Sequence, residues 1–250
     1  MGKEGKYLYC IIDGKEGRNF GDIGIGGRGD RVSTVGFSDL SAVISSTPMT
    51  QYVINRENMT AHEKVIETVM KEHTVLPVRF CTIAASPDEV RTLLRRRYSE
   101  FKGLLKDMEN KIEMGLKAVW KNMNPIFEEI AAENREVQRL KKRVEGKPES
   151  RDNSVKIALG RSVKSALEAK KEKEAQKILT TFKRTALDTR KNDLFGDSML
   201  LNAAFLIDQM REKEFDFLVE DLGKEYEDRI NFRYVGPAPP FNFVNIVVKW

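Results

Sequence analysis

The sequence predicts an α+β fold in two domains. We expect a small N-terminal α+β domain at residues 1–110 and a ferredoxin-like C-terminal domain at residues 111–250, with long helices and an extra terminal strand. The chain has 250 residues, of which 40% are hydrophobic, so it is long enough for two packed cores. In its second half, strand-like and helix-like segments follow the βαββαβ order that is typical of ferredoxin-like domains.

Aromatic and β-branched residues predict three strands in the first half, at residues 6–13, 31–37 and 40–45. Apolar residues at helical spacing then predict a helix over residues 55–73, and a further strand follows at residues 75–80. These elements would form a compact unit in which strands and helices are segregated along the chain.

The segment Ser86-Pro87-Asp88-Glu89 is the clearest helix start in the sequence. It places a capping Ser, a first-turn Pro and a Glu at the third position ahead of apolar residues at helical spacing that reach Met108. We expect one continuous helix here.

The second half begins with a predicted strand at residues 112–120. Asn124-Pro125 is expected to cap a helix that runs to Val144, with Asn134 among its regularly spaced positions. A polar loop at residues 146–153 precedes a second long helix at residues 154–184, in which residues 170–174 should be solvated.

The remaining elements complete the predicted βαββαβ order. Strands are expected at residues 186–191 and 199–207, a helix at residues 210–226, and a half-buried strand at residues 230–234, where apolar and polar residues alternate. After a Pro-rich turn, an additional strand is expected at residues 241–248.

The sequence lacks a complete set of catalytic or metal-binding residues. Residues 24–29 match GxGxxG, but a strand-like segment follows, so we expect a flexible hairpin turn rather than a dinucleotide-binding loop. His62-Glu63 lacks the second His of an HExxH site, because Ile66 occupies that position. We therefore expect a protein that is not an enzyme and holds no cofactor and no metal.

Cysteine usage and hydropathy indicate a chain that stays inside the cell. Cys10 and Cys81 lie far apart without a CxxC partner, which favours free buried thiols. The chain has no run of about 18 apolar residues and no signal-peptide pattern at its start, so neither a membrane span nor secretion is expected.

Positive charge is concentrated in residues 131–191, which contain 18 Lys or Arg and 9 Asp or Glu. A solvated helix face with ion pairs is the favoured interpretation, a protein partner the second, and nucleic acid the third. The ferredoxin-like prediction would also fit an RNA-recognition module, but the chain has no segment with the required pattern of stacking aromatic residues.

Several segments, in order along nearly the whole chain, resemble the gas vesicle protein F/L family. The most specific are residues 75–80 (VLPVRF) and 236–244 (GPAPPFNFV). The family usually has Gly where Cys10 and Cys81 stand, and an aromatic residue where Ala238 stands. The other matching segments are residues 7–12, 62–67, 160–161 and 202–207.

The resemblance implies a non-enzymatic accessory or minor structural component of the gas vesicle, located at that organelle in the cytoplasm. Its expected partners are the small, very hydrophobic main shell protein (GvpA type), whose nucleation and assembly it would assist, and other gas vesicle accessory proteins. The alternative is a basic nucleic-acid-binding module with a ferredoxin-like fold.

Two groups of residues are candidates for partner binding. The prolines of the terminal segment restrict its backbone, and Phe241 and Phe243 should share one face of the predicted last strand. The alternative is that both rings complete the core of the second domain. The candidates are Gly236, Pro237, Pro239, Pro240 and Phe241 in the terminal segment, and Lys141, Lys142 and Arg143 in the basic arm.

Overall fold

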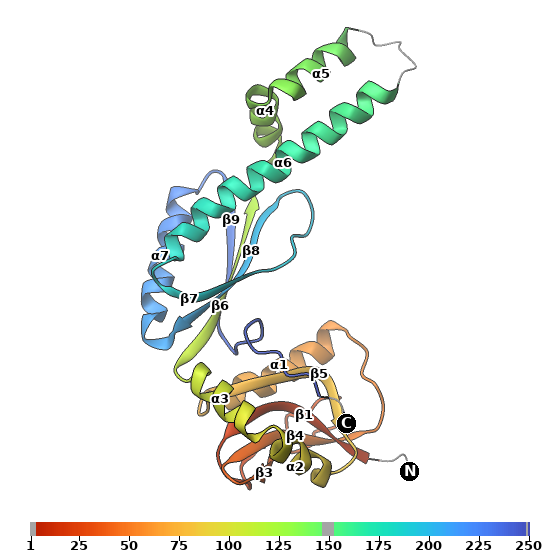
Figure 1. Cartoon of the computed structure of the whole chain (residues 1–250), viewed down its shortest axis with the longest axis vertical. Coiled ribbons are helices and arrows are strands. Elements are labelled where there is room, and N and C mark those ends of the chain that lie inside the picture. The colour runs from red at the N-terminus through yellow and green to blue at the C-terminus, as the bar shows by residue number, and fades with distance from the viewer. Residues whose placement is uncertain (1–3, 147–152, 249) are drawn as a thin grey trace. The chain divides into compact units, whose positions relative to one another are not determined.

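The computed structural model describes residues 4–146, 153–248 and 250 (Figure 1). The chain divides into two compact units. The first comprises residues 1–113, 206–210 and 236–250, and the second comprises residues 114–205 and 211–235. Each unit combines helices with an antiparallel sheet, in agreement with the predicted α+β class.

The first unit is built on a five-stranded antiparallel sheet with the strand order β2-β3-β4-β1-β5. Buried residues of helix α1 pack on one face of this sheet, and those of α2 and α3 pack on the other. The elements are β1 (Glu4–Asp13), β2 (Asn19–Gly21), β3 (Val32–Phe37), β4 (Leu40–Pro48), α1 (Arg56–Met70), β5 (Val75–Ala84), α2 (Pro87–Arg96) and α3 (Tyr98–Met108).

The four strands and the first helix predicted for this half are confirmed. The structure adds one short strand, β2, which was not predicted. The glycine-rich residues 24–29 lie in the loop between β2 and β3, which pair as a hairpin. A strand follows them, as expected, and not a helix.

The single helix expected after Ser86 is in fact two helices. Ser86 caps α2 as predicted, since its hydroxyl accepts the Glu89 N–H at 3.3 Å and the Glu89 carboxylate accepts the Ala85 N–H at 2.5 Å. At Arg97 the backbone leaves the helical region, with φ −108° and ψ 22°. The guanidinium there bonds to Glu100 and lies 4.7 Å above the Phe101 ring, which fixes the start of α3.

The second unit holds most of a four-stranded sheet with the order β7-β8-β6-β9 (Figure 1). Its core includes Phe182, Phe205 and Phe215, whose ring centroids lie 4.5–5.3 Å apart. The elements are β6 (Lys111–Trp120), α4 (Met123–Glu133), α5 (Arg135–Glu145), α6 (Asn153–Phe182), β7 (Ala186–Lys191), β8 (Met199–Asp208), a 3-10 turn η1 (Gln209–Arg211), α7 (Glu212–Glu225) and β9 (Ile230–Ala238).

The helix predicted to run from Asn124 to Val144 is also interrupted. Asn122, and not Asn124, caps α4. Asn134 has φ −101° and ψ 106°, and its side-chain oxygen accepts the N–H groups of Glu136 and Val137, so it ends α4 and caps α5. Of the predicted loop at residues 146–153, residues 147–152 lie outside the described part of the chain.

The expectation that residues 170–174 are solvated is wrong for three of them. The Lys171 side chain is buried and donates to the Gly196 carbonyl at 3.3 Å, and Lys170 pairs with Glu129 at 2.8 Å. Glu174 accepts from Arg229 at 2.6 Å and from the Trp120 indole at 2.8 Å. Bonds from Arg229 lower the pKa of Glu129 to about 2.

Residues 241–248 do not form the predicted strand. The N–H groups of Phe243 and Val244 both donate to the Pro240 carbonyl, at 3.1 and 2.9 Å, which closes a turn. The segment then meets β5 in one isolated parallel bridge between Val78 and Ile246. Because residues 241–243 form this turn, the part of the segment that can pair with β5 begins only after it.

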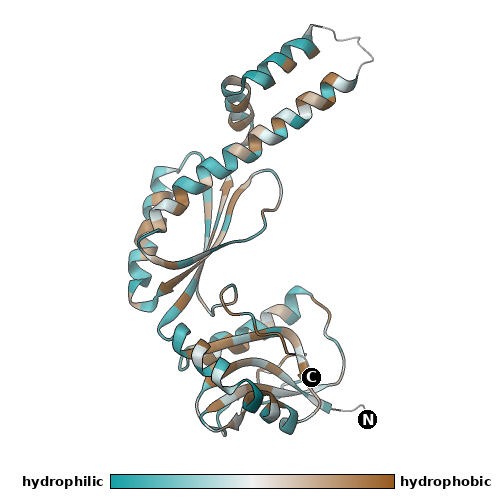
Figure 2. Cartoon of the chain, viewed as in Figure 1, coloured by the Kyte–Doolittle hydropathy of each residue, from teal (hydrophilic) through white to brown (hydrophobic). Residues whose placement is uncertain are grey.

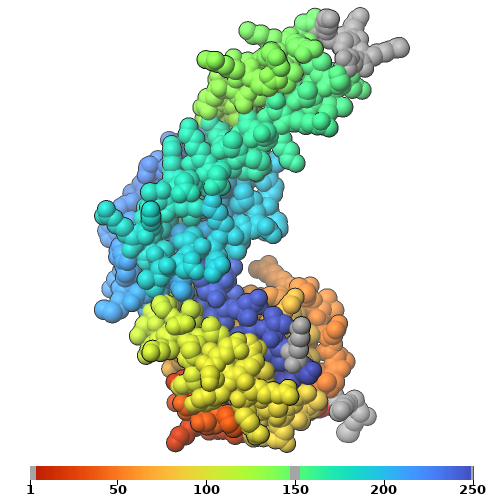
Figure 3. Space-filling model, viewed as in Figure 1, coloured from red at the N-terminus to blue at the C-terminus, as the bar shows by residue number. Residues whose placement is uncertain are grey.

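The terminal segment also packs in the first unit, not in the second domain as expected. Val244 and Ile246 join the core on the side of α2 and α3, and Phe241 packs against the core on the side of α1. Figure 3 shows these last residues, in dark blue, lying against the yellow and orange surface of the first unit. Among the described residues, no helix is long and apolar enough to cross a membrane.

We predict that Ile246→Ala lowers the free energy of unfolding of the first unit by about 2–5 kcal/mol, because it opens a cavity at a side chain that is 1% exposed. Its neighbour Val247 is 41% exposed, so Val247→Ala serves as a control and should change stability by about 0.5 kcal/mol or less. Urea unfolding followed by circular dichroism measures both. Equal effects of the two substitutions would contradict this packing.

Candidate functional site

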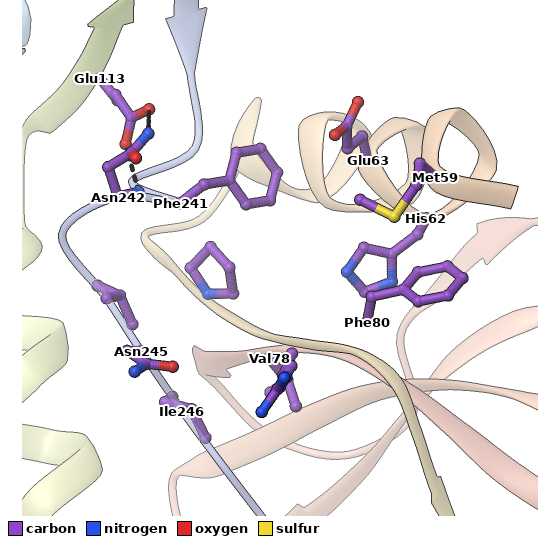
Figure 4. Close-up of a pocket in the computed structure, with 13 residues that line it drawn as sticks. Met59, His62, Glu63, Val78, Phe80, Glu113, Phe241, Asn242, Asn245 and Ile246 are labelled. Atoms are coloured by element: carbon purple, nitrogen blue, oxygen red, sulfur yellow. Dashed lines mark hydrogen bonds between the residues drawn. The ribbon is translucent and has the colours of Figure 1, made fainter. Parts of the chain in front are cut away.

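A groove in the first unit lies between helix α1, strand β5 and the terminal segment (Figure 4). Its volume is about 420 Å³. Seven apolar and six polar or charged side chains line it, so apolar surface alternates with hydrogen-bonding groups. The lining residues are Met59, His62, Glu63, Pro77, Val78, Arg79, Phe80, Glu113, Phe241, Asn242, Val244, Asn245 and Ile246.

An outward bulge of β5 forms one wall of the groove. Leu8 of β1 faces Thr82, and Cys10 faces Pro77, so four residues of β5 stand opposite the single residue Tyr9. Within the bulge Cys81 has φ +63°, a left-handed conformation that glycine adopts without strain. This conformation explains why Gly suits the position in the family that the sequence resembles.

The floor of the groove is a buried network around His62. The Tyr7 hydroxyl lies 3.0 Å from His62 Nδ1 and accepts the Cys81 N–H at 2.9 Å. The imidazole stacks on Tyr9, with ring centroids 5.8 Å apart, and meets Phe80 edge-on at 5.6 Å. Burial lowers the pKa of His62 to about 4 and raises the pKa of Tyr7. The imidazole is therefore neutral at pH 7 and acts as part of the core.

Glu113 anchors the terminal segment beside the groove. Its carboxylate accepts the Asn242 backbone N–H at 2.7 Å and the Asn242 side-chain amide at 2.5 Å (Figure 4). The side chain is only 6% exposed, and burial raises its pKa. This paired contact holds the adjacent Phe241 at the edge of the groove.

The groove has the properties of a binding surface for an apolar segment. Met59, Phe80 and Phe241 offer partly exposed apolar area, and Glu63 and Arg79 supply charge at its edge. Burial raises the pKa of Glu63, and the neighbouring Glu67 adds to this effect. Over the described ranges, no group of three His, Cys, Asp or Glu residues could hold a metal ion.

The terminal candidates from the sequence gather in the first unit. Gly236 and Pro237 are exposed, Pro239 and Pro240 are buried, and Phe241 lines the groove. The buried prolines therefore support Phe241 and leave little surface of their own. Phe241 and Phe243 do not share a strand face, because the backbone turns between Pro240 and Val244.

The basic candidates Lys141, Lys142 and Arg143 are exposed on α5 in the second unit. Figure 2 shows that this helix is mainly hydrophilic. Lys141 lies 4.0 Å from Glu145, a loose contact that stays in water.

Sequence reasoning missed Met59, Glu113 and Asn242. Glu113 carried one usable signal, a carboxylate between Ile112 and Met114 in a mainly apolar strand, whereas nothing in the sequence joined it to a residue more than a hundred positions later. Both thiols are free, as expected. Cys10 is buried, which raises its pKa, but Cys81 is half-exposed and accepts the Tyr52 N–H at 3.2 Å.

A family model described as "Gas vesicle synthesis protein GvpL/GvpF" matches residues 5–245. Gas vesicle protein F1 of Halobacterium salinarum is 26% identical over 246 residues, which cover 97% of this chain and 94% of that protein. Gas vesicle protein F of Nostoc sp. is 26% identical over 205 residues, which cover 81% of this chain and 83% of that protein.

Two solved structures are similar in fold. The crystal structure of gas vesicle protein GvpF from Anabaena sp. has a TM-score of 0.82 at 24% identity and covers 98% of this chain and 100% of that chain. GvpF from Microcystis aeruginosa has a TM-score of 0.77 at 25% identity, with coverages of 96% and 98%.

The depressed pKa of His62 predicts a loss of stability as the pH falls. The unfolded chain binds a proton near pH 6.5 and the folded chain only near pH 4, so the stabilising contribution is complete above pH 6.5 and decreases through this window. The decrease should reach about 3 kcal/mol. His62→Gln should remove most of it, whereas His73→Gln should remove a smaller part, because burial also lowers the pKa of His73 but this residue is only half-buried. A parent protein whose stability is constant between pH 7 and pH 5 would contradict this account.

Glu113→Gln should loosen the terminal segment, because an amide can accept only through its single oxygen and presents its own N–H groups to the Asn242 donors. We expect faster hydrogen exchange over residues 241–248, measured by mass spectrometry. The matched control is Glu109→Gln, at an exposed residue between α3 and β6. Unchanged exchange in Glu113→Gln would show that the two hydrogen bonds do not hold the segment.

Proposed function

We propose that this chain, which belongs to the gas vesicle synthesis protein GvpL/GvpF family, is a non-enzymatic accessory or minor structural component of the gas vesicle. In this proposal it binds the small hydrophobic shell protein of the GvpA type and assists nucleation and assembly of the vesicle, with other accessory proteins as further partners. The observation that carries the proposal is the family match, which spans residues 5–245 and therefore both units.

The groove of the first unit supports this proposal by its chemistry. A very hydrophobic partner needs partly exposed apolar side chains held on a rigid frame. Phe80 packs against His62, Phe241 adjoins the Asn242 that Glu113 holds, and Met59 lines the same groove. The proposed place of action is the gas vesicle in the cytoplasm. The arm residues Lys141, Lys142 and Arg143 form a second proposed contact with a gas vesicle protein.

We also propose the ferredoxin-like description for the second sheet. Its order β7-β8-β6-β9, with helices between β6 and β7 and between β8 and β9, supports the βαββαβ pattern. We propose a domain boundary near residue 110, because the first compact unit ends its first segment at Glu113 and the second unit begins at Met114. Residues 236–250 then belong to the first domain.

The groove variant Met59→Lys should weaken capture of the tagged shell protein at least tenfold, since burial of one methionine contributes about 1.5–3 kcal/mol. Val53→Lys, at an exposed residue ahead of α1, is the control and should bind normally. Co-purification and a quantitative pull-down measure both, with melting temperature as the check on folding. Full capture by a folded Met59→Lys variant would remove the groove from the proposal.

The arm is tested separately by a variant in which Lys141, Lys142 and Arg143 are replaced by Glu. A control variant, in which the exposed Lys64, Lys71 and Lys106 are replaced by Glu, has the same net charge. We expect weaker capture for the arm variant only, and more so at low salt.

The nucleic-acid alternative rests on the same exposed cations. Sub-micromolar binding to duplex DNA at physiological salt, with a steep salt dependence, would support it over the protein partner.

A further inference from the structure

Charge is divided within the second unit between two helical surfaces. Residues 135–145 and 153–166, which comprise α5 and the first half of α6, carry eight Lys or Arg and two Asp or Glu. Residues 212–228, which comprise α7 and the turn after it, carry eight Asp or Glu and two Lys. The two segments therefore have net charges of +6 and −6. This separation is hidden in the overall charge of +5.

The first half of α6 presents an outward surface that we call the basic face, formed by Lys156, Ile157, Arg161 and Lys164. All four are exposed, and Ile157 is 55% exposed although it is apolar. Ile157, Arg161 and Lys164 follow the i, i+4, i+7 spacing of one helix face. No ion pair of the three cations is found among the described residues, in contrast to Lys170 and Lys171 farther along the same helix, which are both paired.

Helix α7 presents the matching surface, which we call the acidic face, formed by Phe217, Glu220, Asp221 and Glu225. Phe217 is 66% exposed, and the three carboxylates stand three, four and eight residues after it. The two lysines of the helix are Lys213 and Lys224, and Lys224 lies 3.5 Å from Asp221. An exposed aromatic ring beside acidic side chains is the chemical counterpart of Ile157 beside the basic ones.

The two faces cannot meet within one molecule. Helix α7 packs against the end of α6, where the Phe182 and Phe215 rings stack with centroids 4.5 Å apart. Ile157 precedes Phe182 by 25 residues on the same continuous helix, which corresponds to about 38 Å at 1.5 Å per residue. The turn after α7 also reaches α6, where Arg229 pairs with Glu174 at 2.6 Å, and Lys164 precedes Glu174 by ten residues, or about 15 Å along the helix. The basic face therefore lies beyond the stretch of α6 that α7 contacts, and another molecule is needed to bring an acidic face to it.

We propose that the basic face of one molecule binds the acidic face of a second copy of this chain. Ile157 and Phe217 lie at the centre of the contact, and Arg161 and Lys164 meet the carboxylates of Glu220, Asp221 and Glu225. The two surfaces differ, so after pairing the first molecule keeps its acidic face free and the second keeps its basic face free, and the contact is heterologous and open. This inference does not rest on binding of the shell protein.

Sedimentation velocity of the full chain over a range of concentrations tests the proposal. The mean mass should rise with concentration at low salt and fall as salt is added, because ions screen exposed charge pairs. The triple reversal Lys156→Glu, Arg161→Glu, Lys164→Glu should weaken association at least about tenfold, and so should Glu220→Lys, Asp221→Lys, Glu225→Lys. Phe217→Ser should weaken it without changing charge.

Mixing the two reversed variants gives the sharpest result. Each basic face is then replaced by an acidic one in the first variant, and each acidic face by a basic one in the second, so the mixture should associate although neither variant does alone. The Lys64, Lys71 and Lys106 reversals control for net charge and should leave association intact. A parent protein that remains monomeric at low salt, or folded variants whose mixture fails to associate, would overturn the proposal.

Discussion

Strand β1 is buried on both faces, and the whole first unit depends on how the polar groups along this strand are bonded. Its side chains divide between the two cores, and the bulge at Tyr9 sends two successive residues to the α1 side. The hydroxyls of Tyr7 and Tyr9 would be costly in such a place without partners. His62, Ser45 and the N–H groups of Ile25 and Cys81 provide those partners.

The same network accounts for the groove. The bulge that gives Tyr7 its contact with Cys81 also displaces the middle of β5 outward, where Val78 meets Ile246 of the terminal segment. Glu113 then holds the turn through Asn242. The groove thus arises from residues whose first role is to satisfy buried polar atoms, which fits a protein whose proposed task is binding.

Local patterns predicted most of the fold, because strands and capped helices have short-range signals. The capping role of Ser86 and the order of the elements in the second half could be read in this way. The breaks at Arg97 and Asn134 could not, since apolar spacing continues across both, and only side-chain contacts decide where the helix ends. The terminal segment was assigned to the wrong unit for a similar reason. Phe241 and Phe243 have the two-residue spacing of a strand face, but the core partners of Phe241, Val244 and Ile246 lie in the first half of the chain.

The packing of the terminal segment also sets an order of events during synthesis. Residues 241–246 leave the ribosome after the whole of the second unit, yet Val244 and Ile246 fill the core of the first unit. Until then α2, α3 and β5 lack part of their apolar cover, and Glu113 has no Asn242 to bind. The groove therefore forms only after the second unit has been synthesised, so a nascent chain does not present this surface to a hydrophobic partner before residues 241–246 have emerged.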